Sequence, residues 1–241
     1  MGTMVSLYLP NHDATSPIAD RAFDWLHEVD ARFSQYRPDS EVSRLMRGQV
    51  QPAGTSAELA DVLELADAIE ALSGGAFDIR GHRDDGAPDP TGVVKGWSVD
   101  RAANILVAVG IDRFSLSAGG DVVVRGGQAP GRPWRVGVAH PFAPDAVALV
   151  LHAEDMAVAT SGTSERGHHI TDSRSGQVAD ELLTVTVAGP ELGRADAYAT
   201  AAFAMGLEGL RWVDALPGYE AAGITHDMRL ISTRGLDRYR A

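Results

Sequence analysis

Residues 195–206, ADAYATAAFAMG, are the stretch that most constrains the fold. Alanine and other apolar residues surround the helix that this stretch predicts, which is typical of a buried helix rather than a surface one. Asp196 and Thr200 stand four positions apart, so their side chains share one face of the helix. Because a buried carboxylate requires a partner or a metal, the stretch predicts an internal helix that carries part of a polar site.

A metal site is one explanation of this polar pair. Carboxylate and hydroxyl oxygens are hard ligands that suit Mg²⁺, which keeps several waters and bridges phosphate oxygens. The alternative is an ordinary polar pair on a solvated helix face. The apolar neighbours favour the first explanation, whereas the spacing by itself leaves both open.

The remaining pattern predicts an α+β fold. The first expected helix runs from Ser16-Pro17 to Phe33, and the second runs from a capping box at Thr55 and Glu58 to the turn at Ser73-Gly74-Gly75. A third helix ends at Gly110, and two more cover about 194–206 and 207–215. The expected strands are 3–9, a series of short β-like runs from 112 to 188, and about 219–224 and 228–232. A polar loop covers 79–91. We therefore expect a single domain over 1–241, with antiparallel-rich mixed sheets and packed helices.

Composition excludes several classes of protein. The chain has 21 Lys and Arg residues against 33 Asp and Glu, a formal charge of −12, which argues against a nucleic-acid groove. It has no cysteine, so disulfides, Cys-zinc sites and thiol nucleophiles are excluded. Walker, Rossmann, H-E-x-x-H and G-x-S-x-G patterns do not occur. An anionic ligand must therefore be held by a local site.

Membrane insertion and secretion are not expected. No run approaches about 18 consecutive apolar residues, so no transmembrane helix is predicted. The stretch MGTMVSLYLP, residues 1–10, has no basic leader before an apolar run, so no secretory signal is expected. A cytoplasmic location is the resulting expectation.

Lys95 is the only lysine in the chain, and every other basic side chain is arginine or histidine. It lies in DPTGVVKGWSVDRA, residues 89–102, between small and apolar residues. A single lysine in this setting suggests a point charge directed at a phosphate or a flavin. An ordinary exposed lysine is the alternative.

Together with that segment, several others form a familiar series: MGT (1–3), FSQYRPDSEVSRL (33–45), SGGAFDIR (73–80), SAGGD (117–121), ATSGTSERGHHITDSRSG (159–176) and ADAYATAAFAMG (195–206). In this order they resemble the FAD:protein FMN transferase family, also called ApbE-like. The resemblance spans essentially the whole chain. It departs from the family pattern in a shorter stretch before DPTG and in a short loop before HHI.

The resemblance implies roles for particular residues. The implied metal ligands are Asp196, Thr200 and the backbone carbonyl of Gly92. The implied FAD contacts are Met1, Ala76, Phe77, Asp78, Asp89, Lys95 and Ile170. His169 matches the histidine that activates the acceptor hydroxyl, and the neutral, basic form of histidine near pH 7 suits that role. His168 has no catalytic counterpart.

The implied activity is Mg²⁺-dependent transfer of FMN from FAD to a Thr or Ser hydroxyl of an acceptor flavoprotein, with release of AMP. Two alternatives remain open. The same site with water as acceptor would be an FAD pyrophosphatase that gives FMN and AMP, and a site without turnover would be a non-catalytic FAD-binding protein.

Overall fold

The computed structural model describes residues 3–10, 17–80, 86–162 and 170–241. Its helices are α1 (Pro17–Phe33), α2 (Glu41–Met46), α3 (Ala57–Leu72), α4 (Thr91–Ala108), α5 (Leu192–Met205) and α6 (Leu207–Asp214), with short 3₁₀ turns η1 (Pro52–Gly54) and η2 (Leu236–Tyr239). Its strands are β1 (Val5–Tyr8), β2 (Phe114–Ala118), β3 (Asp121–Arg125), β4 (Trp134–His140), β5 (Ala143–Ala153), β6 (Met156–Gly162), β7 (Thr171–Asp172), β8 (Gln177–Val178), β9 (Leu182–Gly189), β10 (Glu220–Thr225) and β11 (Leu230–Ser232).

A seven-stranded sheet in the order β1-β2-β3-β6-β9-β10-β11 forms the centre of the fold. Each pair of neighbours in it is antiparallel, and so are the separate hairpins β4–β5 and β7–β8. The α+β class with antiparallel-rich sheets is therefore confirmed. Within the described strands, no parallel pair accompanies the antiparallel ones.

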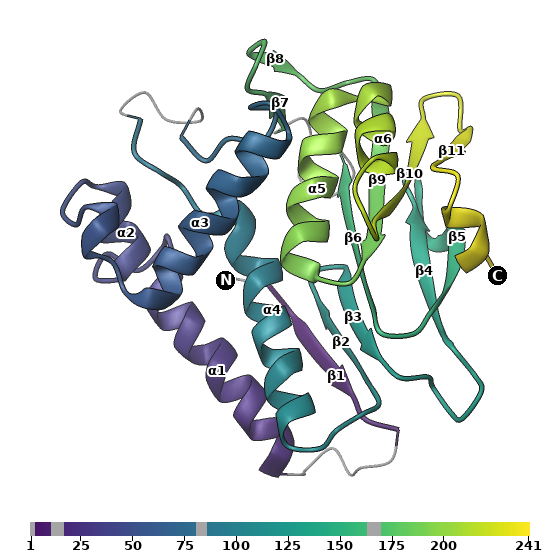
Figure 1. The fold of residues 1–241 in the computed structure, drawn as a ribbon, viewed down its shortest axis with the longest axis horizontal. Coiled ribbons are helices and arrows are strands. Elements are labelled where there is room, and N and C mark those ends of the chain that lie inside the picture. Colours follow the sequence, from purple (N-terminus) through teal and green to yellow (C-terminus); the bar gives the residue numbers. More distant parts are fainter. Residues whose placement is uncertain (1–2, 11–16, 81–85, 163–169) are drawn as a thin grey trace.

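Helices cover one face of this sheet in two layers (Figure 1). Helices α4 and α5 pack directly on the strands, while α1 and α3 pack on the far side of α4. The other face packs on the β4–β5 hairpin. Successive side chains of β3 point to opposite faces of the sheet. Val123 packs in the core under the helices, whereas Val122 and Val124 pack in the core under the β4–β5 hairpin.

The predicted burial of the 195–206 stretch is confirmed. Helix α5 lies between the sheet and the outer helices, and the side chain of Asp196 is buried within it. Helix α4 is buried more completely than a single apolar face predicts, because α1 contacts its outer side while strands contact its inner side. The buried polar residues of these two helices are Ser98 of α4 and Asp196 of α5.

Three local expectations need correction. The cap of α3 is Ser56 rather than Thr55: the Ser56 hydroxyl accepts the Leu59 N–H at 3.3 Å, while the Thr55 hydroxyl donates to the carbonyl of Pro52 at 2.8 Å in the η1 turn. Helix α4 begins at Thr91, inside the expected loop. Helix α2 was not expected, because it is only six residues long.

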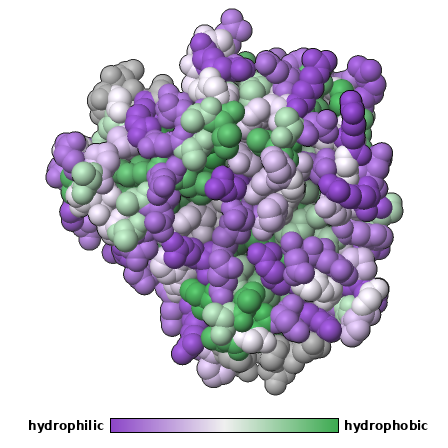
Figure 2. Space-filling model, viewed as in Figure 1, coloured by the Kyte–Doolittle hydropathy of each residue, from purple (hydrophilic) through white to green (hydrophobic). Residues whose placement is uncertain are grey.

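The face of the molecule drawn in Figure 2 is mainly hydrophilic, with apolar residues gathered in several places. None of the helices in the described part of the chain combines the length and the apolar character needed to cross a bilayer.

Candidate active site

A cavity of about 440 Å³ opens between the start of α4, the buried face of α5 and the end of β6. All of the predicted site residues that the structure describes line this cavity, namely Ala76, Phe77, Asp78, Asp89, Gly92, Lys95, Ile170, Asp196 and Thr200. Met1, His168 and His169 lie outside the described residues. The structure thus brings together segments that are separated by up to about half of the chain.

Helix α4 holds α5 in place through a carboxylate. Asp100 accepts hydrogen bonds from the backbone N–H groups of Leu192 at 2.9 Å and Gly193 at 2.7 Å, the first two residues of α5. These N–H groups have no partner within their own helix. Because Lys95 is on α4 and Asp196 is on α5, this contact fixes the relative position of two site residues.

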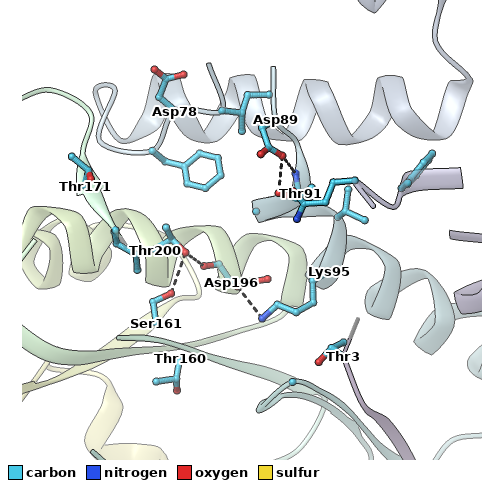
Figure 3. A pocket seen from close by; sticks show the side chains of 18 of the residues that line it. Thr3, Asp78, Asp89, Thr91, Lys95, Thr160, Ser161, Thr171, Asp196 and Thr200 are labelled. Atoms are coloured by element: carbon cyan, nitrogen blue, oxygen red, sulfur yellow. Dashed lines mark hydrogen bonds and ion pairs between the residues drawn. The ribbon is translucent and has the colours of Figure 1, made fainter. Parts of the chain in front are cut away.

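The ammonium group of Lys95 lies beside the buried carboxylate of Asp196 at the cavity wall (Figure 3). It also contacts a second buried carboxylate, that of Asp121. The Lys95 Nζ donates to Asp121 Oδ2 and lies 3.4 Å from Asp196 Oδ1. The backbone N–H of Thr160 donates to the other oxygen of Asp121 at 3.0 Å. The three charged groups therefore carry a formal excess of one negative charge when all are ionised.

Burial changes the acidity of these groups. It raises the pKa of Asp196 to about 7, an effect that the charge of Lys95 opposes and the charge of Asp121 reinforces. Burial also raises the pKa of Asp121 against the attraction of Lys95. For Lys95, burial lowers the pKa, but attraction to Asp196 and Asp121 outweighs burial and leaves the pKa above its usual value. Lys95 is therefore a permanent cation at neutral pH.

The residues present fit a hard divalent cation. Asp196 Oδ2 is buried and has no hydrogen-bond partner among the described residues. The Thr200 hydroxyl lies in the same cavity, 3.0 Å from the hydroxyl of Ser161 and 3.2 Å from the backbone carbonyl of Asp196. An unpartnered buried carboxylate oxygen beside hydroxyl oxygens matches the donor set that Mg²⁺ prefers.

This donor set differs from a cage of several carboxylates or histidines. In the described ranges, no group of three or more His, Cys, Asp or Glu side chains has the arrangement of a metal site. A cation at Asp196 would therefore complete its shell with hydroxyl, carbonyl, water and substrate oxygens. Mg²⁺ commonly binds through one or two carboxylates together with substrate phosphates.

Asp78 and Asp89 lie on the part of the cavity wall away from Lys95 (Figure 3). Each has a local structural bond: Asp78 accepts the N–H of Arg80 at 2.6 Å, and Asp89 accepts both the N–H of Thr91 at 3.1 Å and its hydroxyl at 2.7 Å. Asp89 thereby supports the start of α4. These turns hold both carboxylates at the cavity while leaving further oxygen lone pairs for a ligand.

Several residues at this site have no role that the sequence pattern predicts. Asp121 contacts Lys95. The cavity wall also includes Thr3, Phe33–Tyr36, Thr91, Gly119 and Thr160–Gly162. Most of them belong to segments quoted above, such as SAGGD (117–121) and the ATSG that begins the segment 159–176. The missing signal was which of their side chains point inward, since that depends on the packing of β3 and β6 under the helices.

The fold and the cavity define an α+β protein with an acidic ligand site that carries a single lysine, built between two buried helices and the main sheet. A family model described as the ApbE family matches residues 1–83 and 82–222. This chain belongs to the ApbE family.

Three curated relatives share one name. The chain is 26% identical to the FAD:protein FMN transferase of Vibrio cholerae, over 76% of this chain and 72% of that protein. It is 31% identical to the FAD:protein FMN transferase of Treponema pallidum, over 61% of this chain and 46% of that protein. The match to the Escherichia coli protein of the same name, also 31% identical, covers 50% of this chain and 37% of that protein.

Solved structures share the fold. The flavin transferase ApbE from Vibrio cholerae superposes with a TM-score of 0.84 at 22% identity, covering 99% of this chain and 96% of the other. The ApbE protein from Thermotoga maritima gives a TM-score of 0.83 at 22% identity with the same coverage. The arrangement of helices and sheet is therefore that of ApbE proteins.

Proposed function

We propose that this protein transfers the FMN half of FAD to a Ser or Thr hydroxyl of an acceptor flavoprotein, with Mg²⁺ as cofactor and AMP as the second product. Membership of the ApbE family and the shared name of its relatives make the chain a flavin transferase. The metal, the acceptor hydroxyl and the release of AMP are the proposed part.

One observation carries the proposal. Segments that the family resemblance assigned to FAD and to the metal line a common cavity, and an ammonium group and an unpartnered carboxylate oxygen lie at its wall. In a chain with a formal charge of −12, a permanent cation inside a cavity is suited to an anionic ligand such as a pyrophosphate.

The chemistry needs positioning and charge neutralisation more than a protein nucleophile. The acceptor hydroxyl oxygen would attack the phosphorus on the FMN side, the bridging P–O bond would break, and AMP would leave with the bond's electrons. His169 would accept the hydroxyl proton. Lys95 would place its positive charge beside the phosphate oxygens.

Asp196, Thr200 and the carbonyl of Gly92 would hold the metal. When bound, Mg²⁺ would withdraw charge from the pyrophosphate oxygens. Gly92 is in the first turn of α4, on the cavity wall. The unpartnered oxygen of Asp196 supports this assignment.

The test is a transfer assay. Purified protein is incubated with FAD, Mg²⁺ and candidate acceptors that carry a Ser/Thr flavinylation motif, and flavin fluorescence is sought on the acceptor after denaturing electrophoresis. We expect fluorescence that survives denaturation, one AMP per flavin transferred, and loss of both with Asp196→Asn. AMP release without any acceptor would indicate an FAD pyrophosphatase instead. Intact FAD after incubation with every component would indicate a binding protein without turnover.

A further inference from the structure

The ammonium group of Lys95 is shared unequally between its two carboxylates. It donates a hydrogen bond to Asp121 and forms a longer ion pair with Asp196, at 3.4 Å. The side chain of Asp121 is 2% exposed and is also held by the backbone N–H of Thr160 on β6. Asp196 keeps one oxygen without a partner among the described residues. The contact with Asp121 is therefore the fixed one.

The stem of Lys95 passes close to Gly119. Its Cδ lies 4.0 Å from the position that a Cβ would occupy at Gly119, in the tight turn between β2 and β3 where Gly119 has a φ of +56°. A side chain at residue 119 would crowd Thr3, since its Cβ would be 2.5 Å from the Thr3 hydroxyl, whereas it would only touch the stem of Lys95. The flexible four-carbon stem can shift its ammonium group without a change in the backbone of α4.

The charges also favour replacement of Lys95 by a divalent cation as the partner of Asp196. Without a metal, Lys95 is the cation that partly compensates Asp196. A divalent cation at Asp196 would repel the ammonium group at this distance, because like charges a few ångströms apart in a partly buried site are unfavourable. Asp121 is the remaining carboxylate that Lys95 already contacts.

We propose that Lys95 is an internal counter-ion of Asp196 that an incoming divalent cation displaces, and that Asp121 is the positioning residue which retains Lys95 at the cavity wall after the exchange. This inference rests on the proposed metal site. It predicts that metal binding, before any chemistry, releases the ammonium group from Asp196. The group, still bonded to Asp121, can then face a bound anion.

The single lysine makes a direct measurement possible. In protein labelled with ¹⁵N at lysine Nζ, the side-chain spectrum contains one signal, from Lys95. Titration with Mg²⁺ should shift this signal along the same saturation curve that calorimetry gives for Mg²⁺ binding. The signal should persist at saturation, because the hydrogen bond to Asp121 slows exchange with water. In Asp121→Asn it should broaden beyond detection once Mg²⁺ is bound.

Glu220→Gln is a matched control. Glu220 is also a buried carboxylate, bonded to Thr233, Gly235 and Arg238 at the other end of the sheet. This variant should leave the Lys95 signal and the Mg²⁺ titration unchanged. An equal loss of the Lys95 signal in Glu220→Gln would overturn the role of Asp121.

A double-mutant cycle separates positioning from simple charge. Asp121→Asn should weaken Mg²⁺ binding in the presence of Lys95, because the ammonium group then pairs with Asp196 alone. In a Lys95→Met background the loss should be smaller by about threefold or more, a coupling typical of residues that act through each other. An equal loss in both backgrounds would overturn the positioning role.

The wild-type titration keeps the inference testable if the variants fold poorly. Saturating Mg²⁺, detected by calorimetry, with an unmoved Lys95 signal would overturn the exchange and leave the metal site standing. No Mg²⁺ binding at all, or equal binding by Asp196→Asn, would overturn the metal site and the exchange together.

Discussion

Gly96 of α4 lies directly against Gly193 of α5. A Cβ atom at residue 96 would come 2.7 Å from the carbonyl oxygen of Leu192 and 2.8 Å from the Cα of Gly193, both closer than real Cβ contacts. Lys95 precedes one of these glycines and Asp196 follows the other by three residues. Backbone contact between the two helices therefore places the ammonium group within 3.4 Å of the carboxylate.

Gly96→Ala should separate the two helices. The added methyl has backbone rather than flexible side chain to displace, so we expect a loss of about 1–3 kcal/mol in the free energy of unfolding, measured with urea. Mg²⁺ affinity should fall as well, because Asp196 moves relative to α4. Gly54→Ala is the control, since its Cβ would meet only Val50 Cγ1 at 3.7 Å. Equal stability of the two variants would contradict the close approach.

Asp100→Asn should weaken the start of α5. The carboxylate accepts two backbone N–H groups, whereas the amide presents one acceptor oxygen and turns an N–H₂ group toward a donor. We expect about 1–2 kcal/mol less stability, the usual range for losing a helix cap, together with weaker Mg²⁺ binding in calorimetry. Asp39→Asn, at an exposed position, should change stability by less than about 0.5 kcal/mol. Unchanged Mg²⁺ affinity in Asp100→Asn would show that α5 holds its position without this cap.

In the metal-free protein, the titration of Asp196 should reduce the free energy of unfolding as pH rises from about 4 to about 7. Burial raises the pKa of Asp196 to about 7 in the folded protein, whereas an unfolded aspartate titrates near about 3.9. Within this window the folded state holds a proton that the unfolded chain has released, so the free energy of unfolding falls with pH. One such group contributes at most about 1.4 kcal/mol per pH unit.

Urea unfolding at several pH values in the presence of a chelator measures this slope. Asp196→Asn should have a shallower slope than the wild type, and it should be the more stable protein near pH 7, since replacing an incompletely paired buried charge removes its desolvation cost. Asp39→Asn should retain the wild-type slope. Identical slopes in wild type and Asp196→Asn would mean that Asp196 stays ionised throughout.

His169→Ala should lower the rate of FMN transfer by about 10²–10⁴-fold, the usual contribution of a general base. FAD and Mg²⁺ should still bind, and the rise of the rate with pH through the titration of histidine should disappear. His168→Ala should transfer FMN normally, and thermal midpoints of both variants should be measured beside turnover. A stable His169→Ala protein with normal turnover would exclude the base and leave positioning and charge to account for the rate.

The sequence by itself determined the parts of the molecule that depend on local pattern. The apolar surroundings of Asp196 predicted a buried helix, and the short β-like runs between 112 and 188 predicted antiparallel strands, because side-chain periodicity reports directly which faces are covered. The site segments came from a resemblance in their order and residues, and the described ones do line one cavity. The predicted cap of α3 was wrong by one residue, because the Thr55 hydroxyl donates to the Pro52 carbonyl and Ser56 caps the helix instead.

Only the tertiary structure decided which charges meet. Lys95 and Asp121 are 26 residues apart, on a helix and at the start of a strand, and nothing in either segment specifies the other as its partner. Their contact exists because α4 packs across β2 and β3 while two glycines let α4 and α5 approach at backbone distance. Electrostatic pairing depends on distance and burial, and both are properties of the packed helices and sheet rather than of the order of residues along the chain.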